Sequence, residues 1–313
     1  MSRPLRMFDP ALTYLVTIRS LQGRLFLRPS DETREVLEGV LARAARRYGV
    51  ELFCFNTASN HLHLLVRAPA NNLPQFMQFL LANVSKKIGK LIHWRGAFWE
   101  RRYSAQPVLD DAALLQKVQY LLAHGPKEGL VRTCAEWPGM SALRLMLDGK
   151  PRRVRWFNWS RRCRNATPSN RGRWTDQRWA EEELLQLTPL PIPGFDRLRT
   201  VRRFLRESIR AIEHWARAQF ENVLGVSGVL SQSPQHRPQR PKRKAAPWCH
   251  TTRPALRSAY LDSYRSFADA YRCASAAWRR GDLGAQFPER AVRPFFWPRR
   301  VENAVVVVAQ GGC

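Results

Sequence analysis

Two histidines spaced two residues apart are the sharpest chemical feature of the sequence. They lie in the run Asn60-His61-Leu62-His63, within a stretch rich in apolar residues. Side chains two positions apart on a β-strand share a face, which puts the two Cβ atoms about 6–7 Å apart. Leu62 would then point into a core, and the histidines would lie on the open face of the sheet. Such a pair can bind one metal ion; the alternative is two half-exposed strand histidines without a ligand.

A tyrosine and a third histidine lie further along the chain. Tyr120 and His124 are four residues apart in an apolar stretch and would share one face of a helix. A phenol, with an ordinary pKa of about 10, is a weak nucleophile at neutral pH unless a metal ion or a base activates it or polarises its target. A metal ion at the histidine pair would supply that polarisation. A tyrosine on a helix usually serves packing. The prediction that Tyr120 is a nucleophile therefore depends on its combination with His124 and the histidine pair.

These side chains need a framework of strands and helices. Alternating apolar residues predict strands over Thr13–Arg19, Val50–Phe55, His61–Val66 and Tyr103–Val108. Apolar residues at helical spacing predict helices over Asp31–Tyr48, Leu73–Ile92 and Ala112–His124. Asp110 is a candidate N-cap for the last of these. The order βαββαβ followed by a helix predicts an α+β, ferredoxin-like antiparallel sheet with helices on one face and a C-terminal helix that carries the tyrosine.

These landmarks, taken in order, resemble one known family. The sequence resembles the single-tyrosine HUH transposases of the insertion-sequence 200/605 class, and within it the REP-associated tyrosine transposases. The resemblance runs from about residue 11 to about residue 140. It rests on the opening strand Tyr14–Arg19, the histidine run Asn60–Leu65, the stretch Phe98-Trp99-Glu100-Arg101-Arg102-Tyr103 and the run from Tyr120 to Val131.

The resemblance implies a site and a reaction. It implies that His61 and His63 bind a divalent cation, Mg²⁺ or Mn²⁺, and that Tyr120 attacks DNA. Family members often have Asn or Gln four residues after the nucleophile, where this chain has His124; a third imidazole ligand is reasonable and favours a softer metal than Mg²⁺. The implied activity is transposition, in which single-stranded or hairpin DNA is cleaved and rejoined through a 5′-phosphotyrosine. A homodimer is one implied assembly, and the tyrosine could serve its own subunit or the partner.

Three cations near these landmarks are candidate DNA contacts. Arg101 and Arg102 immediately precede the predicted edge strand, and Lys117 lies one helical turn before Tyr120. Guanidinium and ammonium groups at such places can bind phosphate oxygens. A solvated charged face is an equally good interpretation of the arginine pair.

The charge of the chain indicates a polyanionic partner. Its 313 residues include 52 Lys and Arg against 25 Asp and Glu, giving a net charge of +27. Residues 1–148 hold 20 basic and 12 acidic side chains, whereas residues 149–313 hold 32 and 13. This rise in net charge after residue 148 predicts three parts. They are an HUH domain over 1–148, a basic linker rich in aromatic residues and proline over 149–193, and a helical extension over 194–313. Helices are expected over Arg178–Leu187, Leu198–Phe220 and Leu256–Trp278, with a basic arm near 231–246.

Composition also narrows the functional classes. The sequence contains no run of about 20 apolar residues and no signal-peptide pattern, so we expect a cytoplasmic protein without a membrane partner. Its six cysteines form no C-x-x-C pair, which argues against a zinc ribbon and a disulfide framework.

Two alternatives stay open. A replication initiator or relaxase would share the chemistry but usually adds a helicase, and no G-x-x-x-x-G-K-[ST] loop occurs here. A non-catalytic DNA-binding regulator would not need His61, His63 and Tyr120.

Overall fold

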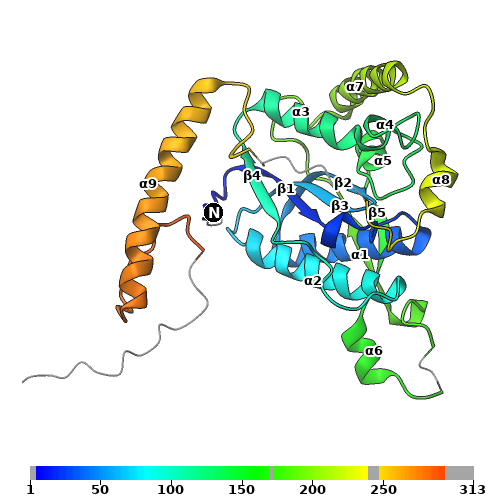
Figure 1. The fold of residues 1–313 in the computed structure, drawn as a ribbon, viewed down its shortest axis with the longest axis horizontal. Helices are drawn as coiled ribbons and strands as arrows, with labels where there is room; N and C mark the ends of the chain where they lie inside the picture. The colour runs from blue at the N-terminus through cyan, green and yellow to red at the C-terminus, as the bar shows by residue number, and fades with distance from the viewer. Residues whose placement is uncertain (1–4, 170–171, 239–246, 293–313) are drawn as a thin grey trace, which may run out of the picture. The chain divides into compact units, whose positions relative to one another are not determined.

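A four-stranded antiparallel sheet organises the larger part of the protein. The computed structural model describes residues 5–169, 172–238 and 247–292. The strands are β1 (Thr13–Arg19), β2 (Glu51–Ala58), β3 (His61–Arg67) and β4 (Ser104–Val108), in the spatial order β2-β3-β1-β4 (Figure 1). This is the ferredoxin-like order, so the predicted fold class is confirmed. The four strands occur where the alternation of apolar residues predicted them.

The register of the sheet aligns polar residues from neighbouring strands. In the central strand β1, Thr17 lies opposite His63 of β3 on one side and Ser104 of β4 on the other. Arg19 lies opposite His61 at the same end of the sheet. Because directly opposed residues point to the same face, Thr17 and Arg19 share the face of the two histidines.

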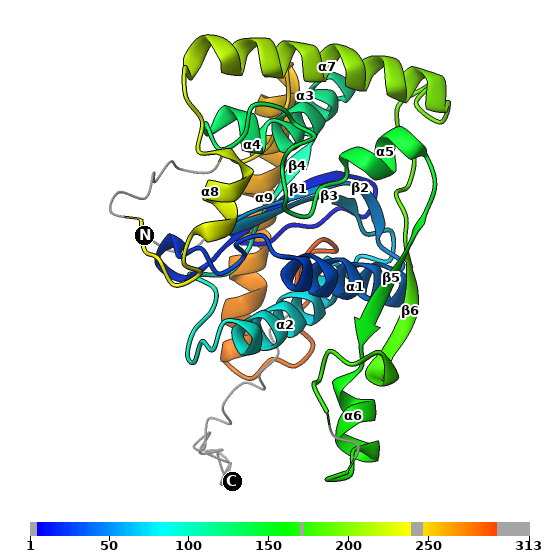
Figure 2. The same cartoon turned by 90° about the vertical axis from the view of Figure 1, so that its right-hand side faces the viewer.

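Helices cover both faces of the sheet (Figure 2). The helices α1 (Asp31–Tyr48) and α2 (Leu73–Leu91) cover the face into which Leu62 and Leu64 point, and both leucines are fully buried. The opposite face carries α3 (Asp111–Leu122) and the short helix α4 (His124–Lys127). The prediction of helices on one face therefore holds for α1 and α2, while the tyrosine-bearing helix covers the other face.

A second, two-stranded sheet occupies the stretch expected to be a linker. Its strands β5 (Arg152–Phe157) and β6 (Ala180–Leu185) pair antiparallel and pack on α1. They enclose α6 (Trp159–Asn165) and the 3₁₀ helix η2 (Gln177–Trp179). Gly39 of α1 permits this packing, because a Cβ at that position would lie 1.9 Å from the carbonyl oxygen of Arg155. Residues 149–193 are therefore largely a structured part of the larger unit.

The helix expected over Arg178–Leu187 is wrong, because most of this stretch forms β6. Glu183 explains why. Its carboxylate is 4% exposed and accepts hydrogen bonds from Arg43 at 2.6 Å and from Arg46 at 2.7 Å, both on α1. These two ion pairs neutralise the buried carboxylate and hold the segment as a strand, although the glutamate run has a high helix propensity.

Three further helices follow the sheet or the hairpin. They are α5 (Leu143–Asp148), α7 (Leu198–Gln219) and α8 (Gly225–Ser231). The predicted helix over Leu198–Phe220 is confirmed as α7, which packs on α3, α4 and α5. Gln119 of α3 donates a hydrogen bond to Ser208 Oγ of α7 at 3.0 Å, and Ser208 is 3% exposed. The helix that carries Tyr120 is thus braced by the C-terminal half of the chain.

The chain divides into two compact units, and their limits differ from the boundaries expected at 148 and 193. Residues 10–253 form the larger unit, and residues 1–9 with 254–313 form the smaller one. Within the smaller unit, α9 (Pro254–Arg279) confirms the predicted aromatic helix, and Tyr264 Oη donates to the carbonyl of Leu5 at 3.2 Å. Residues 239–246 of the expected basic arm lie outside the described residues. Across the described ranges, every helix is too short or too polar to span a bilayer.

Asp110 fixes the start of the tyrosine-bearing helix, as predicted. Its Oδ1 accepts a hydrogen bond from the Ala113 N–H at 2.7 Å, and its Oδ2 accepts from Thr251 Oγ1 and from the Thr252 N–H. Partial burial opposes ionisation, but these hydrogen bonds together lower the pKa of Asp110 to about 2.

We expect Asp110→Ala to lower the free energy of unfolding by about 1 kcal/mol, the usual value of an N-cap. Because the folded-state pKa lies below the ordinary value near 4, the contribution is present above pH 4 and disappears as pH falls toward 2. Urea unfolding of both proteins at several pH values measures this. Asp111→Ala removes a neighbouring exposed carboxylate and is the control. Equal losses in the two variants would contradict the capping role.

Candidate functional site

The three histidines singled out in the sequence meet on one face of the main sheet. One ring nitrogen from each of His61, His63 and His124 lies within 4.8 Å of the others. We call this group the histidine cluster. β3 supplies the first two, and His124 is the first residue of α4, because the helix predicted over Ala112–His124 ends at Leu122. The cluster is not on an open face, as the strand pattern suggested: His63 is 4% exposed and His124 is 6% exposed, because α3 and α4 lie over it.

The hydrogen bonds at Nδ1 of His61 and His124 direct the Nε2 atoms of these two histidines toward each other. His61 Nδ1 lies 2.6 Å from Asn60 Oδ1, and His124 Nδ1 lies 3.3 Å from the Tyr120 carbonyl oxygen. Both partners are acceptors, so each Nδ1 carries the proton and each Nε2 carries a lone pair. These two Nε2 atoms are only 2.7 Å apart. Two lone pairs this close repel each other unless a proton or a metal ion lies between them.

The third imidazole supports the same conclusion. His63 Nδ1 lies 2.8 Å from Thr17 Oγ1, whereas its Nε2 is buried without a hydrogen-bond partner in the described structure. A buried polar atom left unpaired is costly unless something coordinates it. The donor set therefore fits a divalent metal ion. Three imidazoles suit Zn²⁺, Fe²⁺ or Ni²⁺ best, whereas Mn²⁺ binds such a set more weakly and Mg²⁺ prefers oxygen ligands.

Burial keeps these imidazoles neutral. It lowers the pKa of His61 and His63 well below the ordinary value, and the positive charges of neighbouring histidines lower them further. Burial also lowers the pKa of His124 to about 4. Neutral imidazoles can bind a metal ion at pH 7 without first losing a proton.

Tyr120 lies beside the histidine cluster of its own chain. Its ring centroid is 5.4 Å from that of His63 and 5.1 Å from that of His124. Burial and the negative charge of Glu128 raise the pKa of its phenol. Two ammonium groups flank the ring: Lys127 Nζ is 5.1 Å and Lys117 Nζ is 5.9 Å from its centroid. The pKa of Lys117 is lowered by burial and by Lys127. Anionic groups next to the phenol would therefore meet positive charge.

The two arginines predicted as DNA contacts lie near one end of the sheet. Arg101 and Arg102 are exposed and lead from Glu100 into β4. The Glu100 N–H donates to the carbonyl of Arg19, the residue that lies opposite His61. The arginine pair thus lies at the His61 end of β1, whereas Lys117 lies on the tyrosine helix.

Four other residues belong to this site and were not singled out from the sequence. Thr17 and Asn60 orient the two strand histidines, Arg19 lies opposite His61, and Lys127 lies over the Tyr120 ring. Asn60 directly precedes His61, so adjacency could have indicated it. Lys127 lies beyond the end of the helix predicted over Ala112–His124, so helical spacing could not have indicated it. Thr17 and Arg19 depend on the pairing register, which the sequence did not reveal.

Thr17 offers a test of how the strand histidine is held. We expect Thr17→Val to lower Mn²⁺ affinity about 10- to 100-fold, the usual cost of losing a hydrogen bond to a metal-binding histidine. Isothermal titration with Mn²⁺ measures it. Thr13 is buried on the same face of β1 and lies opposite Val108, so Thr13→Val is the matched control. Unchanged affinity in Thr17→Val would show that Thr17 does not orient His63.

Comparison with known proteins finds one matching family model and weak structural similarities. Residues 25–122 match the sequence profile of the family described as Transposase IS200 like. No curated protein matches the chain. A solved REP-associated tyrosine transposase bound to a REP hairpin is similar at 16% identity, covering 58% of this chain and 98% of its own, with a TM-score of 0.41. A transposase candidate from Deinococcus radiodurans is similar at 23% identity, covering 38% of this chain and 95% of its own, with a TM-score of 0.29.

Both structural similarities are weak, so the sequence match carries the assignment. The matched segment includes both strand histidines and Tyr120 and ends two residues before His124. It also contains α1, α2, three of the four strands of the main sheet and α3. Residues 25–122 of this chain are therefore similar in sequence to the IS200-like transposases, and a basic C-terminal half follows at residues 149–313.

Proposed function

We propose that the protein is a metal-dependent DNA strand transferase that uses Tyr120 as its nucleophile. The observation that carries the proposal is the Tyr120 ring, 5.4 Å from the His63 ring and 5.1 Å from the His124 ring, beside three imidazoles whose ring nitrogens lie within 4.8 Å of one another. The similarity of residues 25–122 to the IS200-like transposases supports the same reaction class.

The proposed step is a transesterification at phosphorus. The Tyr120 Oη forms a bond to the scissile phosphorus, and the bond from phosphorus to the 3′-oxygen breaks. The phenol loses its proton and the departing 3′-oxygen gains one, so protons balance. The products are a 5′-phosphotyrosine and a free 3′-hydroxyl. Because one phosphodiester replaces another, a second DNA 3′-hydroxyl can reverse the step and join strands without ATP.

The residues of the site divide this work. A divalent cation bound by His61, His63 and His124 would withdraw charge from a phosphate oxygen and make phosphorus more electrophilic. Mn²⁺ and Mg²⁺ are the ions we propose, and the nitrogen-rich donor set favours Mn²⁺. Lys117 and Lys127 favour negative charge beside the phenol, which offsets the raised pKa of Tyr120. Arg101, Arg102 and Lys117 are the proposed phosphate contacts.

Single-stranded or hairpin DNA is the proposed substrate. The net charge of +27 suits a polyanion. The similar REP-associated transposase was solved with a REP hairpin. Attack by one tyrosine cleaves one strand, which a hairpin with single-stranded arms provides. We further propose that Tyr120 acts on the metal site of its own subunit, because the ring lies beside its own histidines.

A labelling experiment tests the proposal. The protein is incubated with Mn²⁺ and a hairpin DNA that carries a fluorophore at either its 3′ or its 5′ end. A 5′-phosphotyrosine transfers the 3′ label onto the protein in a denaturing gel, whereas the 5′ label appears on a shortened free strand. Protease treatment should remove the shifted band. Cleavage with both labels remaining on free DNA would overturn the covalent mechanism.

A further inference from the structure

The helix α7 has one apolar side and one basic side. Its buried residues are Leu205, Ser208 and Ala216, on the side that packs against the rest of the larger unit. Its exposed arginines are Arg199, Arg202, Arg203, Arg206, Arg210 and Arg217. At 1.5 Å per residue, the part from Arg199 to Arg210 spans about 16 Å, or about five nucleotides of one strand along a B-form axis.

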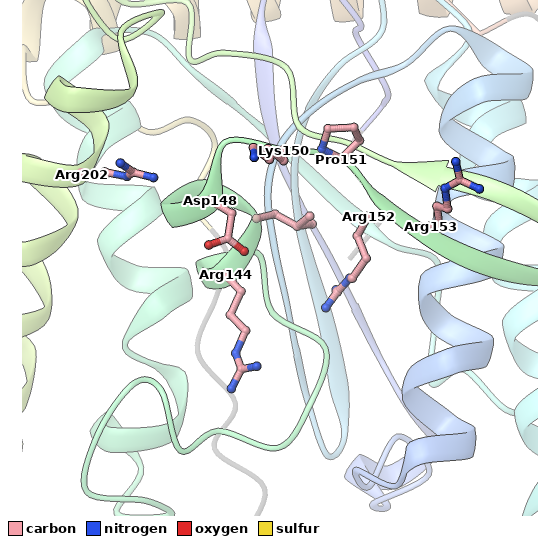
Figure 3. A pocket seen from close by; sticks show the side chains of 8 residues that line it. Arg144, Asp148, Lys150, Pro151, Arg152, Arg153 and Arg202 are labelled. Atoms are coloured by element: carbon pink, nitrogen blue, oxygen red, sulfur yellow. The ribbon is translucent and has the colours of Figure 1, made fainter.

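A basic pocket lies beside the first turns of this helix. It is about 630 Å³ in volume and lies between α5, the start of β5 and α7 (Figure 3). Five cationic side chains line it, together with the carboxylate of Asp148. They are Arg144, Lys150, Arg152, Arg153 and Arg202. We call this the basic pocket; it shares no residue with the histidine cluster.

The charge of the basic pocket is only partly neutralised. Arg152 pairs with Glu38 at 2.7 Å and Arg153 pairs with Glu182 at 3.0 Å. Arg144 and Lys150 are exposed and form no ion pair with any of the described residues. Arg202 donates through Nε to the Leu147 carbonyl at 2.7 Å, which fixes its guanidinium at the side of the pocket nearest α7. Arg144, Lys150 and Arg202 outnumber the single acid Asp148, so the basic pocket keeps a net positive charge.

We propose that the basic pocket and the arginine side of α7 form a second binding surface for DNA backbone phosphates, separate from the phosphate at the tyrosine site. The inference rests on the proposed function for its ligand class. A row of cations around a concavity and along a helix suits a repeating phosphodiester, because each nucleotide adds one negative charge. This surface lies outside the family-matched segment, so it would give the extension a role in substrate affinity.

Equilibrium binding without metal tests this surface independently of cleavage. The probe is a fluorescein-labelled DNA hairpin with single-stranded arms, followed by anisotropy in EDTA over a range of salt concentrations. We expect Arg144→Gln with Lys150→Gln to weaken binding about 2- to 30-fold. We also expect the slope of log K against log salt to become shallower by about 1.4–1.8, the value for two lost phosphate contacts. Asp148→Asn should tighten binding, because it removes the acid of the pocket.

A double variant with the same charge change is the control. Lys86 and Lys90 are exposed on α2, which covers the opposite face of the sheet from α7, so Lys86→Gln with Lys90→Gln should leave binding and the salt slope nearly unchanged. Equal losses in both double variants, or no loss in either, would overturn the second surface. The label-transfer experiment on the same protein reports separately on the tyrosine chemistry. If the wild type forms the adduct but the pocket variants bind DNA normally, the second binding surface is refuted and the tyrosine chemistry is not.

Discussion

Tyr120→Phe is expected to abolish the covalent DNA adduct and to reduce strand cleavage at least about 10³-fold. Phenylalanine keeps the ring and its packing against His63 and His124 but has no oxygen to attack phosphorus. Removing the nucleophile from a site built around it typically costs this much or more. Label transfer from a 3′-labelled hairpin measures the loss. DNA binding should be unchanged, because the phenol oxygen is not a proposed phosphate contact.

Mixing two inactive variants distinguishes action within one subunit from action across a dimer. Tyr120→Phe supplies an intact histidine cluster, and His63→Ala supplies an intact tyrosine. If each tyrosine serves its own metal site, the mixture stays inactive. Recovery of adduct in the mixture would contradict the proposed arrangement within one subunit. Adduct formation by Tyr120→Phe alone would refute the nucleophile assignment.

His63→Ala is expected to reduce Mn²⁺ affinity at least about 100-fold. The change removes a buried Nε2 that has no hydrogen-bond partner among the described residues, and losing even an outer hydrogen bond to a metal ligand costs about 10- to 100-fold. Cleavage should fall in parallel and recover partly at high Mn²⁺ concentration. Isothermal titration gives the affinity, and circular dichroism confirms that the variant is folded. His214→Ala is the control, because His214 is exposed on α7.

A conservative change at the third histidine tests its role as a ligand. His124→Asn replaces the imidazole with the amide that related enzymes often have at this place. An amide oxygen is a harder donor, so the ratio of Mg²⁺-supported to Mn²⁺-supported cleavage should rise. Equal Mn²⁺ affinity in His63→Ala and the wild type would contradict the metal assignment of the histidine cluster.

Local signals in the sequence predicted most of the elements around the site. Alternating apolar residues placed β1 and β3, and helical spacing placed Tyr120 on α3, although His124 begins α4 instead of ending the same helix. The Asp110 cap could be predicted because capping depends on a residue three positions away. Residue types and the family resemblance together predict the three histidines and Tyr120 as one site.

Features set by distant residues could not be predicted. The contact of Thr17 with His63 depends on the register between β1 and β3, which is fixed only when the sheet forms. The burial of the histidine cluster depends on where α3 and α4 pack. The strand β6 lies in a glutamate run with high helix propensity, and its conformation is decided by Arg43 and Arg46, about 140 residues earlier.

The position of β1 limits how this domain can be exchanged between proteins. β1 hydrogen-bonds to both β3 and β4, yet it lies before the segment that matches the family profile. A fragment cut at residues 25 and 122 would retain Tyr120 and both strand histidines while losing the strand that joins the two halves of the sheet. Gene fusions that preserve activity should therefore carry the whole sheet as one inherited block, beginning upstream of Thr13.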